Sequence, residues 1–289
     1  MRLVIGPRGA TLLLLVSALH LSGCSYFLSS ATSKMTDNLS AAVLDQDDPA
    51  TVRDGAPAYL IALDGLIEGN PESERLLLAG AQLYGAYAGA FVDDPERASR
   101  LTLRARRYGE RALCERDRPL CEAASGSYDD FVSLLGETDA EDLPALYGLG
   151  SAWASWVQAN AGDWNAIADL PKLQALMERV VALDDAYEDG SAHLYLGVLH
   201  TLRPASLGGK PELGRQHFER AIEISRGRNL MAKVLFASQY ARLVFDRPLH
   251  DRLLDEVIEA DPHVHGFTLS NVLAQEEAAL LLAGGDDYF

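Results

Sequence analysis

The chain has 289 residues, of which 48% are hydrophobic and 23% are charged, values typical of a globular protein with a substantial core. Its formal net charge is −17, which excludes nucleic acids and anionic lipid headgroups as expected partners, because both are bound through clustered Lys and Arg. The acidic residues are spread along the whole chain, as on a solvated surface.

Residues 1–23 have the pattern of a bacterial lipoprotein signal peptide. Arg2 and Arg8 form a positive segment, and the apolar run that follows is shorter than the roughly 20 residues that span a bilayer. The run ends in Leu21-Ser22-Gly23-Cys24, which matches a lipobox. The alternatives are a secreted protein cut at an ordinary site and a short anchor helix.

We therefore expect Cys24 to be lipidated and residues 24–33 to form a short tether. Stable attachment to a membrane takes more than one acyl chain, and the cysteine of a mature bacterial lipoprotein carries three. By resemblance to sorted lipoproteins of double-membraned bacteria, Ser25 favours the outer membrane. The predicted location is the bacterial envelope, lipid-anchored and facing the periplasm.

Export would also place Cys114 and Cys121 in an oxidising compartment. The two residues flank a predicted inter-helix turn at residues 115–119. They are therefore either a local disulfide or two free thiols, and the sequence leaves this open.

The hydrophobic period is helical almost throughout the mature chain, and we find no convincing run of alternating β-branched residues. Short breaks rich in Gly, Asn, Asp and Pro separate the helices, which indicates antiparallel helix pairs. We expect one all-α domain over residues 34–289. Its predicted helices span residues 34–46, 50–69, 72–91, 95–114, 127–137, 143–161, 169–184, 189–202, 211–226, 229–246, 248–260 and 266–283.

The helix predicted at residues 143–161 has little polar surface and is expected to lie at the centre of the domain. Asp142 is its predicted N-cap, Pro144 lies in the first turn, and Gly162 follows the end. One face carries large apolar residues. The opposite face carries small residues that allow another helix to approach closely, namely Gly148, Ser151, Ala152, Ser155 and Ala159.

Weak internal repeats indicate a TPR-like array, that is, stacked antiparallel helix pairs in an α-solenoid or bundle. Similar helix ends recur from residue 181 to 221 and on to 257, steps of 40 and 36 residues, close to the roughly 34 of a tetratricopeptide repeat. The first-helix pattern of that repeat is echoed by Leu146-x₂-Leu149-Gly150-x₂-Trp153 and by His193-x₂-Leu196-Gly197-x₂-His200. Because the matches are degenerate, a divergent array is expected.

The glycine-rich segment Gly208-Gly209-Lys210 does not fit a phosphate-binding loop, because Pro follows the lysine and a helix precedes the glycines. An inter-helix turn is the better interpretation. The loop remains a candidate for contact with a ligand or a partner.

Three histidines, His193, His200 and His217, would lie on paired helices. They occupy repeat positions that aromatic core residues normally fill, so packing explains them better than a metal site does. His263 and His265 follow Pro262 in a turn and lack supporting ligands. We expect no metal.

Enzyme motifs are absent from the sequence: it contains no hydrolase elbow, dinucleotide fingerprint, HExxH or cysteine-rich pair. Adjacent acids such as Glu276-Glu277 diverge on a helix and make poor partners in acid–base catalysis. The sequence therefore predicts a protein that is not an enzyme and has no cofactor.

An aromatic cluster is the remaining candidate for a functional site. It is either plain core or the wall of an apolar cavity between facing helices, a usual place for a small-molecule site. The candidates are Tyr147, Trp153, Trp156, Trp164, Tyr195, Phe218, Phe236 and Tyr240.

Several segments in combination resemble the TatT-type T component of TRAP (tripartite ATP-independent periplasmic) transporters. The resemblance covers about residues 35–289, together with the lipoprotein signal. The segments that carry it are DLPALY at 142–147, Trp153 and Trp156, DW at 163–164, IADLP at 167–171, GGKPE at 208–212, HFERAI at 217–222, NVLAQ at 271–275, LLL at 280–282 and DDYF at 286–289.

The resemblance implies a periplasmic lipoprotein with a TPR-like fold, a homotrimer, and an apolar pore through each protomer. It also implies association with the substrate-binding P component of the transporter and a role in binding or channelling a hydrophobic or organic-acid ligand, or a lipid. The alternative is a TPR-like scaffold lipoprotein that binds a protein or peptide in envelope assembly.

Overall fold

A computed structural model describes residues 41–289 of the chain. The predicted signal peptide, Cys24, the tether and most of the helix expected at residues 34–46 lie outside the described residues. Residues 41–289 are all-α and contain no strand, which confirms the predicted fold class. None of the helices in this described part is long and apolar enough to span a membrane.

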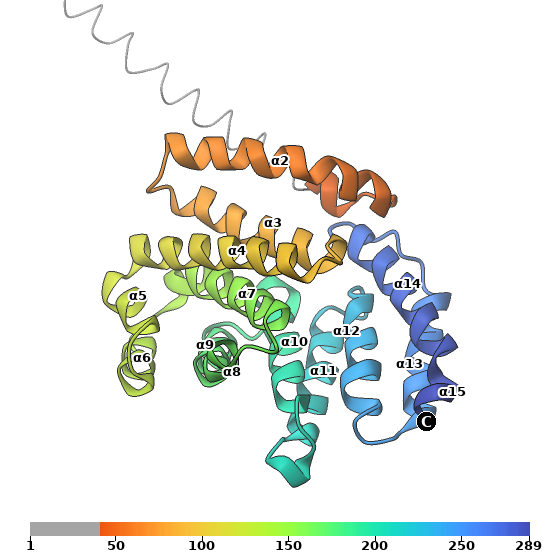
Figure 1. Ribbon diagram of the computed structural model, residues 1–289. Coiled ribbons are helices and arrows are strands. Elements are labelled where there is room, and N and C mark those ends of the chain that lie inside the picture. The colour runs from red at the N-terminus through yellow and green to blue at the C-terminus, as the bar shows by residue number, and fades with distance from the viewer. Residues whose placement is uncertain (1–40) are drawn as a thin grey trace, which may run out of the picture.

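The helices follow one another with short turns (Figure 1). In chain order they are α2 (Pro49–Gly69), α3 (Glu74–Phe91), α4 (Pro95–Arg116), α5 (Arg118–Ala124), α6 (Tyr128–Leu135), α7 (Leu143–Ala159), α8 (Trp164–Ala168), α9 (Leu170–Leu183), α10 (Tyr187–Thr201), α11 (Pro211–Ile224), α12 (Leu230–Leu235), α13 (Arg247–Glu259), α14 (Thr268–Ala283) and α15 (Gly285–Tyr288). Short 3₁₀ turns lie at Ala140–Asp142 and Ala205–Leu207, and a π-helical segment, Phe236–Ala241, extends α12.

Most predicted helices agree with these bounds within about two residues. The inter-helix break expected at residues 115–119 is present, but it is shorter than predicted. The break between α4 and α5 is the single residue Asp117. Its carboxylate accepts a hydrogen bond from the backbone N–H of Leu120, so it caps α5, and Pro119 fits the first turn of that helix. Helices α5, α8 and α15 are too short to produce a hydrophobic period, and none of them was predicted.

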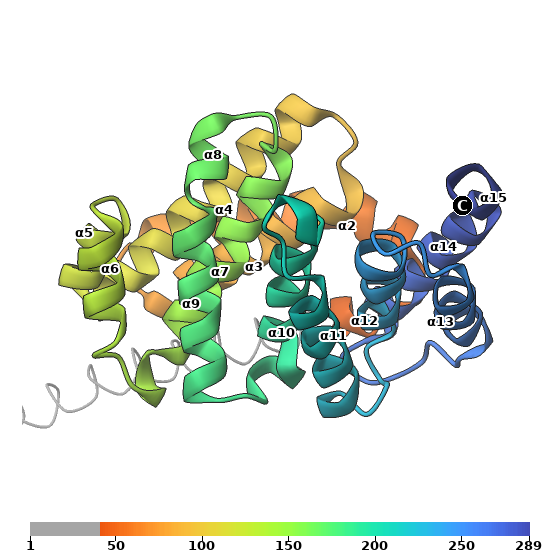
Figure 2. The same ribbon diagram turned by 90° about the horizontal axis from the view of Figure 1, so that it is seen from below.

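The helix array closes into an arc whose two ends meet (Figures 1 and 2). Helices α2, α3 and α4 form a layer, α7, α9 and α10 lie beneath it, and α14 returns to contact α2. At this junction an Asp45 carboxylate oxygen lies 2.5 Å from Nδ1 of His265, and the other oxygen accepts a hydrogen bond from Gly266 N–H. The repeat pattern had predicted the stacking but not this closure.

Helix α7 packs against α3, α4 and α9, as expected for the central element. Its small residues are the points of close approach: an added Cβ on Gly148 would lie 2.4 Å from a methyl of Leu78 on α3. An added Cβ on Gly150 would be equally close to Leu176 on α9. These glycines therefore set how closely the helices pack.

The predicted capping role of Asp142 is wrong. Asp142 occupies the position before α7, but its side chain makes no capping hydrogen bond to that helix. Instead its carboxylate binds Arg116 on α4 and the backbone N–H of Asp139. The residue therefore links two helices and closes the preceding 3₁₀ turn.

Cys114 and Cys121 form a disulfide with a Cα–Cα distance of 5.0 Å. The bond ties the last turn of α4 to α5. Of the two alternatives that the sequence left open, the structure has the bonded pair.

Candidate functional site

A cavity of about 210 Å³ lies where α3, α7 and α10 meet. Each of the three helices contributes side chains to its wall, so the cavity depends on tertiary packing between distant parts of the chain. The residues that line it are Ala81, Gln82, Gly85, Ala86, Tyr147, Ser151, Ala152, Ser155 and Tyr195.

The cavity exists because small residues face one another across α3 and α7. The closest approach is at Gly85, where an added Cβ would lie 3.2 Å from Oγ of Ser155. Ala81 and Ala152 are fully buried beside this contact, but their methyl groups are too short to fill the remaining space. The small face that the sequence predicted on residues 143–161 therefore holds the helices together and leaves an opening.

Two tyrosines form the aromatic part of the wall. The rings of Tyr147 and Tyr195 meet edge to face with centroids 6.4 Å apart, and Tyr187 packs on Tyr147 in the same manner at 5.5 Å. Tyr147 and Tyr195 keep some accessible surface, yet burial raises the pKa of both phenols. This combination is typical of groups in an internal recess, where the phenols stay neutral.

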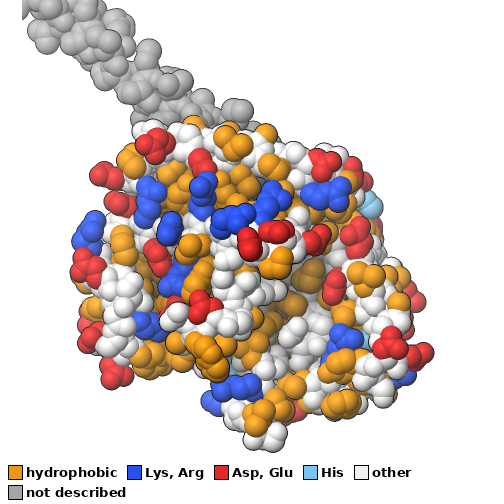
Figure 3. All heavy atoms as spheres, in the orientation of Figure 1, with side chains coloured by type: hydrophobic (Ala, Val, Ile, Leu, Met, Phe, Trp, Pro, Cys, Tyr) orange, Lys and Arg blue, Asp and Glu red, His pale blue; other side chains and the backbone are white. Residues whose placement is uncertain are grey.

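The molecular surface also has a visible hollow (Figure 3). Figure 3 shows a depression right of centre, between the layer of α2, α3 and α4 above and the C-terminal helices below and to the right. The closed arc of helices therefore leaves open space toward its middle.

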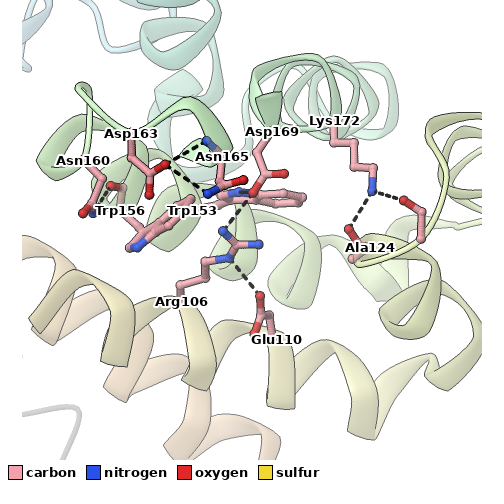
Figure 4. Close-up of polar contacts among 11 residues, drawn as sticks. Arg106, Glu110, Ala124, Trp153, Trp156, Asn160, Asp163, Asn165, Asp169 and Lys172 are labelled. Carbon is pink, nitrogen blue, oxygen red and sulfur yellow. Dashed lines mark hydrogen bonds and ion pairs between the residues drawn. The ribbon is translucent and has the colours of Figure 1, made fainter. Parts of the chain in front are cut away.

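Trp153 and Trp156 hold a partly buried arginine, Arg106 (Figure 4). The Arg106 guanidinium lies 4.7 Å from the Trp153 ring centroid and 4.4 Å from that of Trp156. The same group pairs with Asp169 and Glu110, and the Trp153 indole N–H donates to Asp169. This cluster ties α4 to α7 and to the start of α9.

The other predicted aromatic residues lie outside the wall of the cavity. Phe218, Phe236 and Tyr240 are buried; Phe218 stacks on Phe236 with centroids 5.6 Å apart, and Tyr240 lies tilted against Phe236 at 5.4 Å. Trp164, on α8, is 82% exposed. Among the eight candidates, the structure thus brings Tyr147 and Tyr195 to the cavity, and ligand contact by the other six stays a prediction.

The Gly208-Gly209-Lys210 segment is an inter-helix turn, and it too lies outside the wall of the cavity. Gly208 has φ +82°, and an added Cβ on Gly209 would overlap the carbonyl oxygen of Arg203. Lys210 N–H donates to the carbonyl of His200. Both glycines are therefore needed for the turn itself, and contact with a ligand or partner stays a prediction.

The three histidines form a polar chain between α10 and α11. Nδ1 of His193 lies 2.8 Å from Nδ1 of His217, and Nε2 of His193 lies 2.7 Å from a carboxylate oxygen of Asp185. His200 stacks on His217. Within residues 41–289, no group of three or more His, Cys, Asp or Glu side chains has the geometry of a metal site.

Sequence reasoning missed the α3 side of the cavity, which Ala81, Gln82, Gly85 and Ala86 provide. The available signal was the run of small residues over 79–90, whose spacing matches the small face of α7. The prediction selected residues with large aromatic rings, whereas a cavity forms where side chains are short.

Comparison with known proteins identifies a family and a relative. The family described as TRAP transporter T-component matches residues 45–289. Over 266 residues the chain is 27% identical to an uncharacterized protein of Treponema pallidum (strain Nichols), an alignment that covers 85% of this chain and 81% of that protein.

Proposed function

The chain belongs to the TRAP transporter T-component family, and from this premise we propose that it binds the apolar part of a ligand in the cavity between α3, α7 and α10. The family assigns an accessory role in a TRAP transporter of the bacterial envelope. The observation that carries the proposal is the cavity itself, walled by small residues and by Tyr147 and Tyr195.

The size of the cavity limits what it takes up. Its volume of about 210 Å³ is several times the roughly 30 Å³ share of one water molecule. It is below the roughly 300–1,000 Å³ of sites that enclose a drug-sized ligand. The cavity therefore accepts one segment of a ligand, and burial of that segment supplies about 25 cal/mol per Å² before the cost of association.

The further parts of the proposal come from the sequence and the family resemblance. Lipidation at Cys24 holds the protein at the outer membrane, facing the periplasm. There it passes the ligand to, or receives it from, the substrate-binding P component. The protein acts as a homotrimer, with each protomer carrying its own site.

The test uses the full lipidated chain and native mass spectrometry of the protein purified from its membrane. We expect a co-purified apolar molecule in the wild type. Ala86→Phe places a ring into the cavity from a position on α3 that retains accessible surface, so the fold should tolerate it. Ala182→Phe, on the exposed face of α9, is the matched control.

The proposal holds when Ala86→Phe loses the co-purified molecule and Ala182→Phe retains it. It fails when both variants retain it equally. Association with the P component is tested separately by pull-down. If Ala86→Phe loses this association and Ala182→Phe keeps it, ligand binding in the cavity is linked to transfer of the ligand to the P component.

A further inference from the structure

Helix α4 carries an excess of positive charge in a strongly acidic chain. It has seven Arg and three Glu, a net charge of +4, whereas the whole chain has a net charge of −17. Figure 3 shows a row of Lys and Arg side chains across the layer of α2, α3 and α4. Because salt at about 0.15 M screens charges that are more than about 8 Å apart, a small ligand beside α4 experiences this local charge more than the net charge.

A pocket of about 320 Å³ lies between α4 and α5. It shares no lining residue with the cavity between α3, α7 and α10. The residues that line the pocket are Arg107, Glu110, Arg111, Cys114, Cys121 and Ser125. The four residues from α4 recur at three- and four-residue spacing, so they share one face of the helix, and two guanidinium groups border the same space. Its volume is at the lower end of the roughly 300–1,000 Å³ of small-molecule sites.

The two arginines of the pocket have no ionic partner among residues 41–289. Arg111 is held in place by other contacts: it donates to the carbonyl of Pro71 at 2.8 Å, and its guanidinium lies 5.7 Å from the centroid of the Tyr108 ring. Arg107 is exposed and makes no hydrogen bond or ion pair within the same residues. Since a guanidinium has five N–H donors, both side chains keep donors for a ligand.

The acid that lines the pocket does not neutralise these arginines. The Glu110 carboxylate binds Arg106 at 2.8 Å, on the side of α4 that faces the two tryptophans (Figure 4). Other arginines of α4 are likewise matched by carboxylates, namely Arg104 by Asp64, Arg106 also by Asp169, and Arg116 by Asp142. Like charges four residues apart on a helix repel each other. An anion between Arg107 and Arg111 would relieve this repulsion and gain two ionic partners.

We propose that the pocket between α4 and α5 binds a small organic anion, a dicarboxylate or a phosphate ester, through Arg107 and Arg111. Each planar guanidinium can donate two parallel N–H bonds to a carboxylate or a phosphate. The Ser125 hydroxyl makes no hydrogen bond within residues 41–289 and supplies a further donor. The disulfide between Cys114 and Cys121 fixes α5 against α4 beside these groups. This second site goes beyond the proposed function and does not depend on it.

The experiment measures binding of succinate, inorganic phosphate and uncharged succinamide to the full chain by calorimetry at neutral pH and about 0.15 M salt. We expect both anions to bind, succinamide not to bind, and the tighter anion to identify the preferred group. Arg107→Gln should weaken anion binding about tenfold. Arg107→Lys keeps the charge without the planar fork and should weaken it less. Arg100→Gln, at an exposed position of the same helix, is the matched control and should leave it unchanged.

The proposal is wrong if neither anion binds to the wild type at millimolar concentration, if succinamide binds as tightly as the anions, or if Arg107→Gln and Arg100→Gln behave alike. Ala86→Phe, which fills the cavity between α3, α7 and α10, should leave anion binding unchanged. Loss of anion binding in Ala86→Phe would assign the anion to that cavity and overturn the site between α4 and α5. Circular dichroism of each variant verifies that the helical fold is retained.

Discussion

Asp45 and His265 lie 220 residues apart in the chain, and their side chains meet at 2.5 Å between a carboxylate oxygen and Nδ1. The second carboxylate oxygen accepts the backbone N–H of Gly266. Beside this contact α2 touches α14. The pair therefore fastens the first described residues to the last long helix and closes the arc of helices.

Replacing Asp45 by Asn should loosen this junction. The neutral amide loses the charge-assisted bonds to His265 and Gly266. We expect faster hydrogen exchange in residues 45–52 and 263–270, measured by mass spectrometry, with the core of α7 unchanged. Asp47→Asn is the control. The Asp47 carboxylate lies 3.7 Å from His263, which is too far for a hydrogen bond. Equal exchange in both variants would show that the Asp45 contact does not close the arc.

Acid should have the same effect as this substitution. The hydrogen bond from Gly266 N–H is the main cause that lowers the pKa of Asp45 below 3.8 in the folded chain. The stabilisation is therefore fully present above that value and is lost as pH falls through the lowered pKa. Protection at residues 45–52 should fall in strong acid in the wild type and change less in Asp45→Asn.

Arg106 should be among the most sensitive residues outside the apolar core. Arg106→Leu removes its contacts with both tryptophans and leaves the Asp169 carboxylate without its ionic partner. We expect a loss of roughly 2–4 kcal/mol in the free energy of unfolding, measured with urea. Arg100→Leu, at an exposed pair with Glu96 on the same helix, should change it by about 1 kcal/mol or less. Similar losses in the two variants would contradict the role of the cluster.

The helices could be predicted from sequence because each depends on local signals. Pro95, Pro211 and Pro248 lie in the first turn of helices whose starts were predicted within one residue. The arc closure depends on Asp45 and His265, which no local pattern connects. Stacked pairs were therefore predictable, and their curvature into a closed arc was not.

The candidate site was predicted only in part, for a physical reason. Bulky aromatic residues such as Trp153 and Phe218 gain most from full burial, so they pack into the core. A cavity remains where residues such as Gly85 and Ala86 are too small to fill the space between helices. A search for facing small-residue stripes would have indicated α3 and α7 together.

Gly197 should resist substitution because α11 approaches it closely. An added Cβ would lie 2.6 Å from the Phe218 ring, so Gly197→Ala must displace α10 or rotate the ring. We expect a loss of about 1–3 kcal/mol in the free energy of unfolding despite the better helix propensity of alanine. Gly55→Ala in α2 meets no atom within 4 Å and should gain about 0.5–1 kcal/mol. The same sign for both changes would contradict the packing argument.

The disulfide should stabilise the chain by restricting its unfolded state. Cys114 and Cys121 are seven residues apart, and closing so short a loop contributes about 2 kcal/mol in the chain-entropy description. We expect the double variant Cys114→Ser/Cys121→Ser to unfold at lower temperature. A reducing agent should lower the melting temperature of the wild type and leave the variant unchanged. No response of the wild type to reduction would show that the bond contributes nothing.

His217 should make the stability of the α10–α11 pair depend on pH. Burial, with the charges of His193 and His200, lowers the pKa of His217 from 6.5 to about 4. Its Nδ1 lies 2.8 Å from that of His193, so one of these two nitrogens must remain unprotonated to accept the bond. As the pH falls, His217 is protonated in the unfolded chain before it is protonated in the folded chain. The stability that depends on neutral His217 is therefore complete above about pH 6.5. It is lost as pH falls toward about 4.

His217→Gln removes this group, so the difference in melting temperature between wild type and variant should stay constant from pH 7.5 to about pH 6.5 and shrink as the pH falls from there to 4.5. The carboxylates titrate in both proteins, so their effects on the melting temperature cancel in that difference. His263→Gln is the control: Asp261 raises the pKa of this exposed histidine, so any stabilisation it gives is present at low pH and is lost as pH rises. A difference for His217→Gln that stays constant across the range would show that His217 keeps its ordinary pKa, and that the α10–α11 contact does not depend on its neutral form.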